Sequence, residues 1–368
     1  MRTTSAEPPR SYPGRPRKRG SNVLEQLTRL GIEAAERELI PDKLLRWTMH
    51  RLCQSRLAEY DGDPEVTAEK TQAFLRQMSS GPIAQSTGEA NEQHYEVPAE
   101  FYRLILGPAF KYSSCYWTSD STTLAEAELE ALMRTCANAE LGDGQRILEL
   151  GCGWGSLTLH MARIYPNARI TAISNSASQG DFIRQRARES GLENLEVLTR
   201  DINDFQPEGR FDRVVSVEMF EHVRNHPLLL ERISGWLNPG GKLLVHVFCC
   251  RAAPYTYEDE GANDWMSRNF FTGGVMPGDD LFLRYQEHLL VERQWRWSGV
   301  HYQRTLDAWL ELLDANRSAV EQALQRAGER DPKRAAQRWR MFLMACSELF
   351  GSRRGRDWWV SHYRFKLR

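Results

Sequence analysis

Three ionisable side chains follow directly after an apolar run in the segment FDRVVSVEMFEHVRNH, residues 211–226. The run ends at Val217, and Glu218, Glu221 and His222 come next. Carboxylates can attract a cationic substrate, and a histidine can take a proton near neutral pH. If a helix begins there, the three side chains lie three and four positions apart and share one face. Two acids at a helix start can also simply complement the helix dipole, which explains Glu221 but not the triple.

A glycine-rich turn, ELGCGWGS over residues 149–156, follows an earlier apolar run and precedes a helical pattern. Gly151, Gly153 and Gly155 let the backbone turn tightly and let a ligand lie against the main chain. The third glycine comes one residue earlier than in the GxGxxG pattern of dinucleotide binders, and no Lys-Ser/Thr pair follows to make a phosphate loop. A zwitterionic ligand without phosphates, such as S-adenosylmethionine, fits this turn better.

Polar residues after two further apolar runs can complete a site for this ligand. Ser174, Asn175 and Gln179 follow the second run, and their neutral groups can hydrogen-bond a ribose diol. Dinucleotide enzymes usually place an acid at that point, so the neutral set is a departure. Asp201 and Ile202 follow the third run and suit an adenine amino group beside an apolar wall, although Asp201 could instead cap the next turn.

The elements that must position these residues are short β-rich runs alternating with helical stretches, which is typical of a doubly wound, mostly parallel α/β sheet. The expected strands are RILEL (146–150), ARITAIS (168–174), LEVLTR (195–200), FDRVVSV (211–217) and GKLLVHVF (241–248). Helices are expected between them, near 155–165, 177–191 and 225–237. LLVERQWRW (289–297) and WWVSHYRFKL (358–367) can complete the sheet at one edge, which gives seven strands. Ligands bind at the carboxyl ends of such parallel strands, where all the motifs above lie.

The rest of the chain is expected to add a tail, a helical segment and a cover. Residues 1–21 form a disordered basic tail, since the first twenty residues hold six Arg/Lys, one acid and four prolines. Residues 22–90 are predicted to be helices, interrupted near Pro41, and a linker. Residues 91–368 form the α/β domain, with a helical and loop cover over about 255–350.

Composition points to a soluble, cytoplasmic protein. A net charge of −1, 41% hydrophobic and 26% charged residues are ordinary for a globular chain. No signal-peptide core and no run of 18 apolar residues is present. The seven cysteines show no metal-binding spacing, so reduced thiols and no metal are expected. The basic tail could contact nucleic acid or anionic lipid, but a solubilising tail is the favoured interpretation, and no nucleic-acid partner is expected.

Taken in order, the motifs resemble the cyclopropane-fatty-acid-synthase-like superfamily of S-adenosylmethionine-dependent methyltransferases, and within it the coclaurine N-methyltransferase group. The likeness is carried by HYEVPAEFY (94–102), FKYSSCYW (110–117), ELGCGWGS, SNSASQ (174–179), SVEMFEH (216–222), RTLDAWL (304–310), MACSELFG (344–351) and WWVSHYRFK (358–366). It covers roughly residues 90–368 and implies a Rossmann-like class I methyltransferase domain with S-adenosylmethionine as cosubstrate.

The resemblance also implies roles for particular residues. Tyr112 and Ser113 match the position that closes over the cofactor. Glu218, Glu221 and His222 match the E-x-x-E-H box of the alkaloid enzymes, whose first Glu and His are proposed to handle the amine proton. The expected reaction is methyl transfer to a small, cyclic or aromatic, tetrahydroisoquinoline-like amine. The complete expected cofactor set is Tyr112, Ser113, Glu149, Gly151, Gly153, Ser174, Asn175, Gln179, Asp201 and Ile202.

Transfer of a methylene or methyl group to a lipid acyl chain is the alternative. The lipid cyclopropane synthases usually have Gly in place of the first Glu of the box. They hold a bicarbonate base with a Cys of the YSCxYW motif, the box Glu and His, a fifth-strand His and a late Tyr. This chain keeps Glu221 and has His246, but Ser114 replaces that Cys, and Met341-Phe342 stand in the late helix with no tyrosine nearby. We therefore expect no bicarbonate site, and membrane contact belongs to this alternative alone. A non-catalytic binding protein is disfavoured because the box is complete.

A few further residues are expected near the substrate. His246 lies at a strand end, and Trp265, Phe271 and Tyr302 belong to an aromatic-rich stretch that suggests a mobile lid suited to cation–π contact with an amine. Core packing is the competing explanation for each of them. Cys346 matches a cysteine in the last helix of the mycolate-type cyclopropane synthases and is a catalytic candidate, with a buried structural thiol as the alternative. The sequence leaves a homodimer open.

Overall fold

The computed structural model describes residues 21–60, 63–84, 97–258, 261 and 264–368. The predicted basic tail, except for Ser21, lies outside the described residues, as does most of the predicted linker before residue 91. Within the described part of the chain, no helix is long and apolar enough to cross a membrane.

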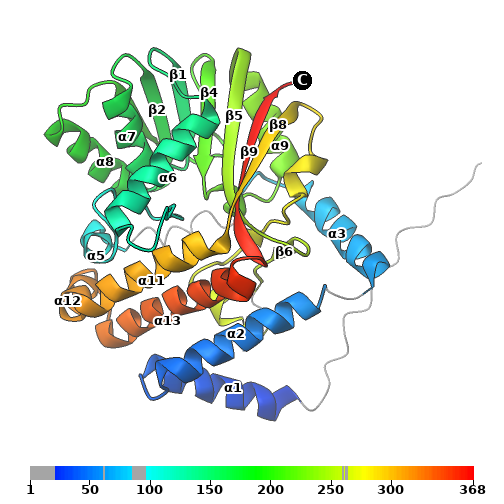
Figure 1. The fold of residues 1–368 in the computed structure, drawn as a ribbon, viewed down its shortest axis with the longest axis vertical. Coiled ribbons are helices and arrows are strands. Elements are labelled where there is room, and N and C mark those ends of the chain that lie inside the picture. The colour runs from blue at the N-terminus through cyan, green and yellow to red at the C-terminus, as the bar shows by residue number, and fades with distance from the viewer. Residues whose placement is uncertain (1–20, 61–62, 85–96, 259–260, 262–263) are drawn as a thin grey trace, which may run out of the picture.

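A single sheet of seven strands forms the centre of the molecule, in the order β3-β2-β1-β4-β5-β9-β8 (Figure 1). The parallel strands are β1 (Arg146–Leu150), β2 (Arg169–Ser174), β3 (Leu195–Thr199), β4 (Phe211–Val217) and β5 (Leu237–Cys250). β9 (Trp358–Leu367) pairs antiparallel with β5, and β8 (Leu289–Trp297) pairs antiparallel with β9. The predicted sheet and both of its late edge strands are confirmed.

Helices cover both faces of the sheet because successive strand residues point to opposite sides. On one face, Val215 and Leu244 pack with α6 (Leu124–Ala139) and α7 (Ser156–Ile164). On the other face, Val214 and Leu243 pack with α9 (His226–Trp236). α8 (Ala177–Glu189) lies beside α7 (Figure 1). The strand order reverses between β1 and β4, where an open α/β sheet forms a ligand crevice.

A second group of helices stacks below the sheet in Figure 1. It consists of α11 (Gly299–Ala315), α12 (Arg317–Arg326), α13 (Pro332–Gly351), α5 (Ala99–Ile105), α1 (Ser21–Glu36) and α2 (Asp42–Ala58). α2 buries Leu45, Cys53 and Leu57, and this group shares one hydrophobic cluster with parts of the segment after β5. That segment contains β6 (Tyr255–Thr256), α10 (Trp265–Asn269), β7 (Val275–Met276) and the 3₁₀ helix η3 (Leu281–Arg284).

The predicted break near Pro41 is present between α1 and α2. Glu38 adopts a left-handed backbone conformation at φ 60°, and Pro41 then stands at the N-cap of α2. A third helix, α3 (Pro64–Met78), begins at a proline and is capped by Asp63, whose side chain accepts a hydrogen bond from the Glu65 backbone. Prolines at these positions do not remove a helical hydrogen bond.

Candidate active site

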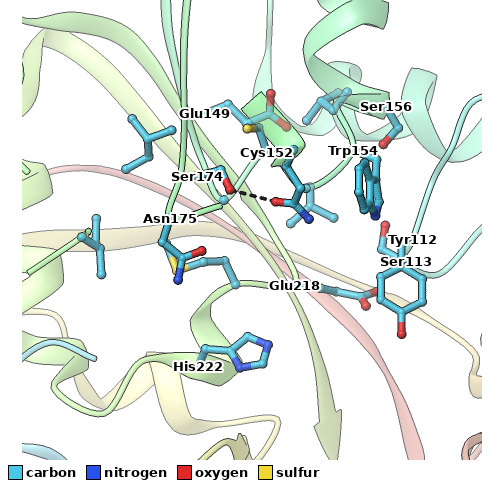
Figure 2. A pocket seen from close by; sticks show the side chains of 18 of the residues that line it. Tyr112, Ser113, Glu149, Cys152, Trp154, Ser156, Ser174, Asn175, Glu218 and His222 are labelled. Carbon is cyan, nitrogen blue, oxygen red and sulfur yellow. Dashed lines mark hydrogen bonds between the residues drawn. The ribbon is translucent and has the colours of Figure 1, made fainter. Parts of the chain in front are cut away.

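One pocket opens at the carboxyl ends of β1, β2, β3 and β4 (Figure 2). All ten residues of the expected cofactor set line it, together with two of the expected catalytic residues, Glu218 and His222. In Figure 2, Glu149 lies at one end of the pocket, and Glu218 and His222 lie towards the other. The structure thus brings these twelve residues, which are spread between positions 112 and 222, to one pocket. Their individual roles stay predictions.

The glycine turn between β1 and α7 follows the geometry that glycine permits. Gly151 has φ 78°, and a Cβ there would lie 2.8 Å from the Met219 side chain. Gly155 has φ 80°, and a Cβ would lie 2.6 Å from Ile183. A Cβ on Gly153, at φ 51°, would meet no described atom within 4 Å, and Gly153 lines the pocket. The backbone at Gly153 therefore faces space that a ligand can occupy.

Two buried donors at the pocket wall lack partners among the described residues. Ser174 Oγ donates to Gln179 Oε1 at 2.8 Å, but Gln179 Nε2 has no acceptor. Trp154 Nε1 is also buried without an acceptor. Because buried donors are almost always paired in folded proteins, these two fit a ligand that carries acceptor oxygens and nitrogens. A nucleoside with an amino-acid arm meets that requirement.

Glu149 is a buried acid at the same wall. Thr158 Oγ1 donates to its Oε2 at 2.5 Å, and burial raises the pKa of Glu149 to about 8. An ammonium group brought in by a ligand would favour the ionised form and lower that pKa. The site therefore suits the positively charged amino group of S-adenosylmethionine.

Glu218 leaves β4 in a left-handed conformation, φ 50°, that non-glycine residues rarely adopt. Its Oε1 accepts a hydrogen bond from the Ser114 backbone N–H at 2.9 Å and lies 3.1 Å from His246 Nε2. Its Oε2 accepts from the Tyr302 hydroxyl at 2.6 Å. Burial raises the pKa of Glu218, and Lys111 opposes that change. The carboxylate is thus held from three directions and is more basic than an exposed glutamate.

The expectation that Glu218, Glu221 and His222 share one helix face is wrong. The chain after β4 forms only a single 3₁₀ turn, Phe220–His222, and α9 begins at His226. Glu221 is not part of the pocket wall. Its Oε1 accepts from the Phe248 backbone at 2.8 Å, and burial raises its pKa well above the ordinary value. Burial therefore favours the neutral form of Glu221, which weakens its expected contribution to a negative field.

His222 does line the pocket, and its ring stacks on Phe271 with centroids 5.2 Å apart. Burial lowers the pKa of His222 to about 4. The expected titration of this histidine near neutral pH is therefore wrong, and the imidazole is uncharged at pH 7.

A tyrosine hydroxyl reaches Glu218 from a helix other than the late helix α13. Tyr302 comes from α11, not from α13, and its hydroxyl binds Glu218. His246 on β5 is fully buried beside Glu218. His246 and Tyr302, expected as substrate residues, thus contact the side chain of the catalytic candidate. Phe271 stacks on His222, which lines the pocket together with Glu218.

Two other candidates lie away from the pocket wall. Trp265 packs on Phe270, and its Nε1 donates to Glu36 Oε1 at 2.8 Å, so it ties α10 to α1. Cys346 on α13 does not line the pocket, and burial raises the pKa of its thiol. A thiol held protonated is a poor nucleophile and a poor base.

Lys111 is a pocket residue that the sequence analysis missed. It is buried, and its Nζ donates to Ser113 Oγ at 2.6 Å and to the Ser114 carbonyl at 2.7 Å. The available signal was a lone lysine inside FKYSSCYW, a stretch otherwise apolar or hydroxylic. Lysine is almost never fully buried without a specific reason.

Comparisons with known proteins agree with this geometry. The family described as mycolic acid cyclopropane synthetase matches residues 84–357. (S)-coclaurine N-methyltransferase of Thalictrum flavum subsp. glaucum is 38% identical over 297 residues, which cover 79% of this chain and 81% of that protein. Pavine N-methyltransferase of the same plant is 31% identical over 340 residues, covering 91% and 96%. The cyclopropane-fatty-acyl-phospholipid synthase of Escherichia coli (strain K12) is 28% identical over 271 residues, covering 73% and 66%.

A solved structure is similar over nearly the whole chain. The crystal structure of coclaurine N-methyltransferase bound to N-methylheliamine and S-adenosylhomocysteine has a TM-score of 0.88 and 34% identity, covering 94% of this chain and 99% of that one. Its bound nucleoside product agrees with the unpaired donors and the open glycine turn found in the pocket here. The fold, the site and these similarities together show that the chain belongs to the mycolic acid cyclopropane synthetase family and is an S-adenosylmethionine-dependent methyltransferase.

Proposed function

We propose that the protein transfers a methyl group from S-adenosylmethionine to the nitrogen of a small, cyclic or aromatic amine of the tetrahydroisoquinoline type. The observation that carries this proposal is the Glu218 carboxylate, buried in the pocket wall and held by Ser114, His246 and Tyr302. The similarity to coclaurine and pavine N-methyltransferases over most of both chains supports it.

Glu218 is suited to take the proton of the amine. When bound, the cofactor supplies an electrophilic methyl group on its sulfonium. The attacking nitrogen must present a lone pair, whereas an alkylamine arrives largely as ammonium near pH 7. A carboxylate has about four acceptor positions, and three donors hold Glu218, so one position remains for the substrate N–H. Because burial raises the pKa of Glu218, the carboxylate is a stronger base than an exposed glutamate.

His222 contributes an uncharged surface beside that base. An imidazolium there would repel an ammonium, but burial keeps the ring neutral at pH 7. Its face packs on Phe271, so the ring is part of an apolar wall. We therefore assign the proton to Glu218 and a positioning and desolvating role to His222.

A series of aromatic ring contacts runs from His222, which lines the pocket, to Tyr302. Phe271 contacts Phe248 at 5.7 Å between ring centroids, Phe248 contacts Phe350 at 6.0 Å, and Phe350 stacks on Tyr302 at 4.3 Å. Aromatic faces attract both apolar rings and cations, so an amine bound next to His222 and these rings would be cyclic or aromatic.

Acyl-chain modification remains the alternative, and the contacts of Glu218 weigh against it. The Ser114 backbone, His246 and Tyr302 are all occupied by this side chain, so a free bicarbonate would have to compete with a tethered carboxylate for the same donors. An enzyme that supplies its own carboxylate at this point has no need of a dissolved base.

A labelled-methyl assay separates the two reactions. Purified protein with methyl-labelled S-adenosylmethionine is offered simple tetrahydroisoquinolines in one arm and unsaturated phospholipid vesicles in the other, with and without added bicarbonate. We expect label in the amine, unaffected by bicarbonate. Label confined to the phospholipid, or a requirement for bicarbonate, would overturn the proposal.

We also propose a chain organisation and a location for the protein. The proposed organisation is a tail (1–21), a helical segment with its linker (22–90) and a methyltransferase domain with its cover (91–368), and the packing of α2 on α13 supports a role of the helical segment in holding the cover. A cytoplasmic location is supported by the seven cysteines, all of which are free thiols.

A further inference from the structure

Lys111 is a buried lysine that the proposed reaction does not use. Its Nζ has two oxygen partners, the Ser113 hydroxyl and the Ser114 carbonyl, and both are neutral. Among the described residues, no carboxylate lies within ion-pair distance of it. Burying an ammonium is costly unless a negative charge compensates it. The site is therefore incomplete in charge, and Lys111 lines the cofactor pocket.

The two nearby carboxylates are each committed to other donors. Glu128 accepts from the backbone N–H groups of Ala109 at 2.9 Å and of Lys111 at 3.3 Å. Glu218 is held by the three donors described above. Both acids act on the Lys111 ammonium only through space, as its electrostatic environment shows. A third N–H of the ammonium has no partner among the described residues.

Ser113 connects Lys111 to the pocket through a hydrogen bond. Its Oγ accepts a hydrogen bond from Lys111, so its own proton must point elsewhere, and the described residues provide no acceptor for it. Figure 2 places Tyr112 and Ser113 across the pocket from Asn175. With Lys111 protonated, the pocket presents a hydroxyl donor backed by a positive charge, which is a site for an anionic oxygen.

The cofactor brings one such group. Asn175 and Gln179 at β2 and Asp201 after β3 suit its nucleoside, so the amino-acid arm extends towards β1 and the Lys111–Ser113 loop. There Glu149 suits the ammonium of that arm. The carboxylate of the arm would then lie on the side of Lys111 and Ser113. We propose that Lys111 is a positioning residue for the cofactor: its ammonium holds Ser113 so that the Ser113 hydroxyl binds the α-carboxylate of S-adenosylmethionine.

This role predicts that cofactor binding changes the protonation of Lys111. Burial lowers the pKa of Lys111 in the free protein. A carboxylate bound nearby favours the charged form and raises that pKa, so binding takes up a proton at pH values between the two. The charged or titratable groups around Lys111 are Cys115, Glu128, Glu218, His246 and His362. Glu149 works in the opposite direction, because an ammonium ligand lowers its pKa and releases a proton, so the test compares variants at Lys111 alone.

The experiment measures binding by calorimetry and uses no amine, so its failure is distinct from a failure of the proposed N-methylation. The probes are S-adenosylhomocysteine and its decarboxylated analogue, which keeps the adenosine and the ammonium. For Lys111→Met we expect roughly 10–100-fold weaker binding of S-adenosylhomocysteine, as for a lost charge-assisted hydrogen bond, and a change within about twofold for the analogue. Lys70→Met, at an exposed lysine that donates to the Glu59 carbonyl, is the matched control and should leave both affinities unchanged.

Two further measurements guard against a purely structural effect. Ser113→Ala removes one hydroxyl without changing the buried charge, and it should reproduce the selective loss even if Lys111→Met fails to fold. In buffers of different ionisation enthalpy, from about pH 7 to about pH 9.5, the wild type should take up more protons per S-adenosylhomocysteine than Lys111→Met. Equal weakening of both probes, no weakening of either, or identical proton uptake would overturn the proposal.

Discussion

At the scale of single residues, the chemistry of the site depends on one strained position. Glu218 has a positive φ, which costs on the order of 1–3 kcal/mol for a residue that is not glycine. The contacts that hold it come from three other segments, at Ser114, His246 and Tyr302. The strained backbone aims the carboxylate into the cofactor pocket, and the contacts keep it there.

Replacing this carboxylate should slow turnover without affecting the cofactor. We expect Glu218→Gln to reduce kcat by about 10²–10⁴-fold, the usual contribution of a general base, while the affinity for S-adenosylhomocysteine stays within about twofold. Glu196→Gln, at an exposed glutamate of β3, is the control. A variant that kept the full rate on every amine tested would remove Glu218 from the mechanism.

The pH dependence separates Glu218 from His222. A raised pKa means that Glu218 loses its base function as pH falls through a value above the ordinary glutamate range. His222, with a pKa of about 4, would place an acid limb much lower. We expect kcat at saturating amine to rise with pH above the ordinary glutamate range, and His222→Gln to lower the plateau without moving the midpoint. A midpoint that moved in His222→Gln would assign the limb to His222 instead.

At the scale of elements, the turns explain what the sequence did and did not predict. The strands were predictable because runs such as RILEL are buried on both faces, which leaves a local apolar signal. The glycine turn was predictable because Gly151, Gly153 and Gly155 all have positive φ. The turn after β4 was not predictable, since Glu218 is fixed by contacts with residues more than eighty positions away. Lys111 was missed for a different reason: its hydrogen-bond partners are local, but its burial depends on tertiary packing that a local pattern does not show.

The glycine turn gives a test of the cofactor site. Gly153→Trp should abolish measurable binding of S-adenosylhomocysteine, because an indole would project into the open space at that backbone position. Gly144→Trp is a matched control, since Gly144 also has a positive φ and open space around its Cβ direction but does not line the pocket. The control should carry the same backbone strain and keep the affinity. Equal losses in both variants would attribute the effect to strain alone.

At the scale of the whole molecule, the N-terminal helices hold the substrate side together. Arg46 of α2 binds Asp307 of α11 and Glu348 of α13, each at 3.0 Å. Glu36 of α1 is buried and accepts hydrogen bonds from α10 and from α13. These contacts link the beginning of the chain to the helices that surround Tyr302 and Phe350.

Breaking the contacts of Glu36 should therefore weaken amine binding more than cofactor binding. Glu36 pairs with Arg334 at 2.6 Å and Arg338 at 3.1 Å and accepts from Trp265. We expect Glu36→Ala to lower stability by about 2–4 kcal/mol and to raise the KM for the amine, with S-adenosylhomocysteine affinity unchanged. Glu33→Ala breaks only the exposed pair with Arg37 and should change neither quantity. A loss of cofactor affinity equal to the loss of amine affinity would contradict this division.

The position of β9 has a consequence for how the protein is made. β9 lies between β5 and β8, yet the chain from 251 to 357, which includes α11, α12 and α13, separates β5 from β9. During synthesis, β1 to β5 can pair with one another and form the part of the sheet that carries the cofactor pocket. The outer edge of β5 stays open until β9 has left the ribosome. An open edge in an apolar sheet is a site for wrong pairing with other chains. Nascent chains stalled between these two strands should thus be the species that most needs chaperone protection.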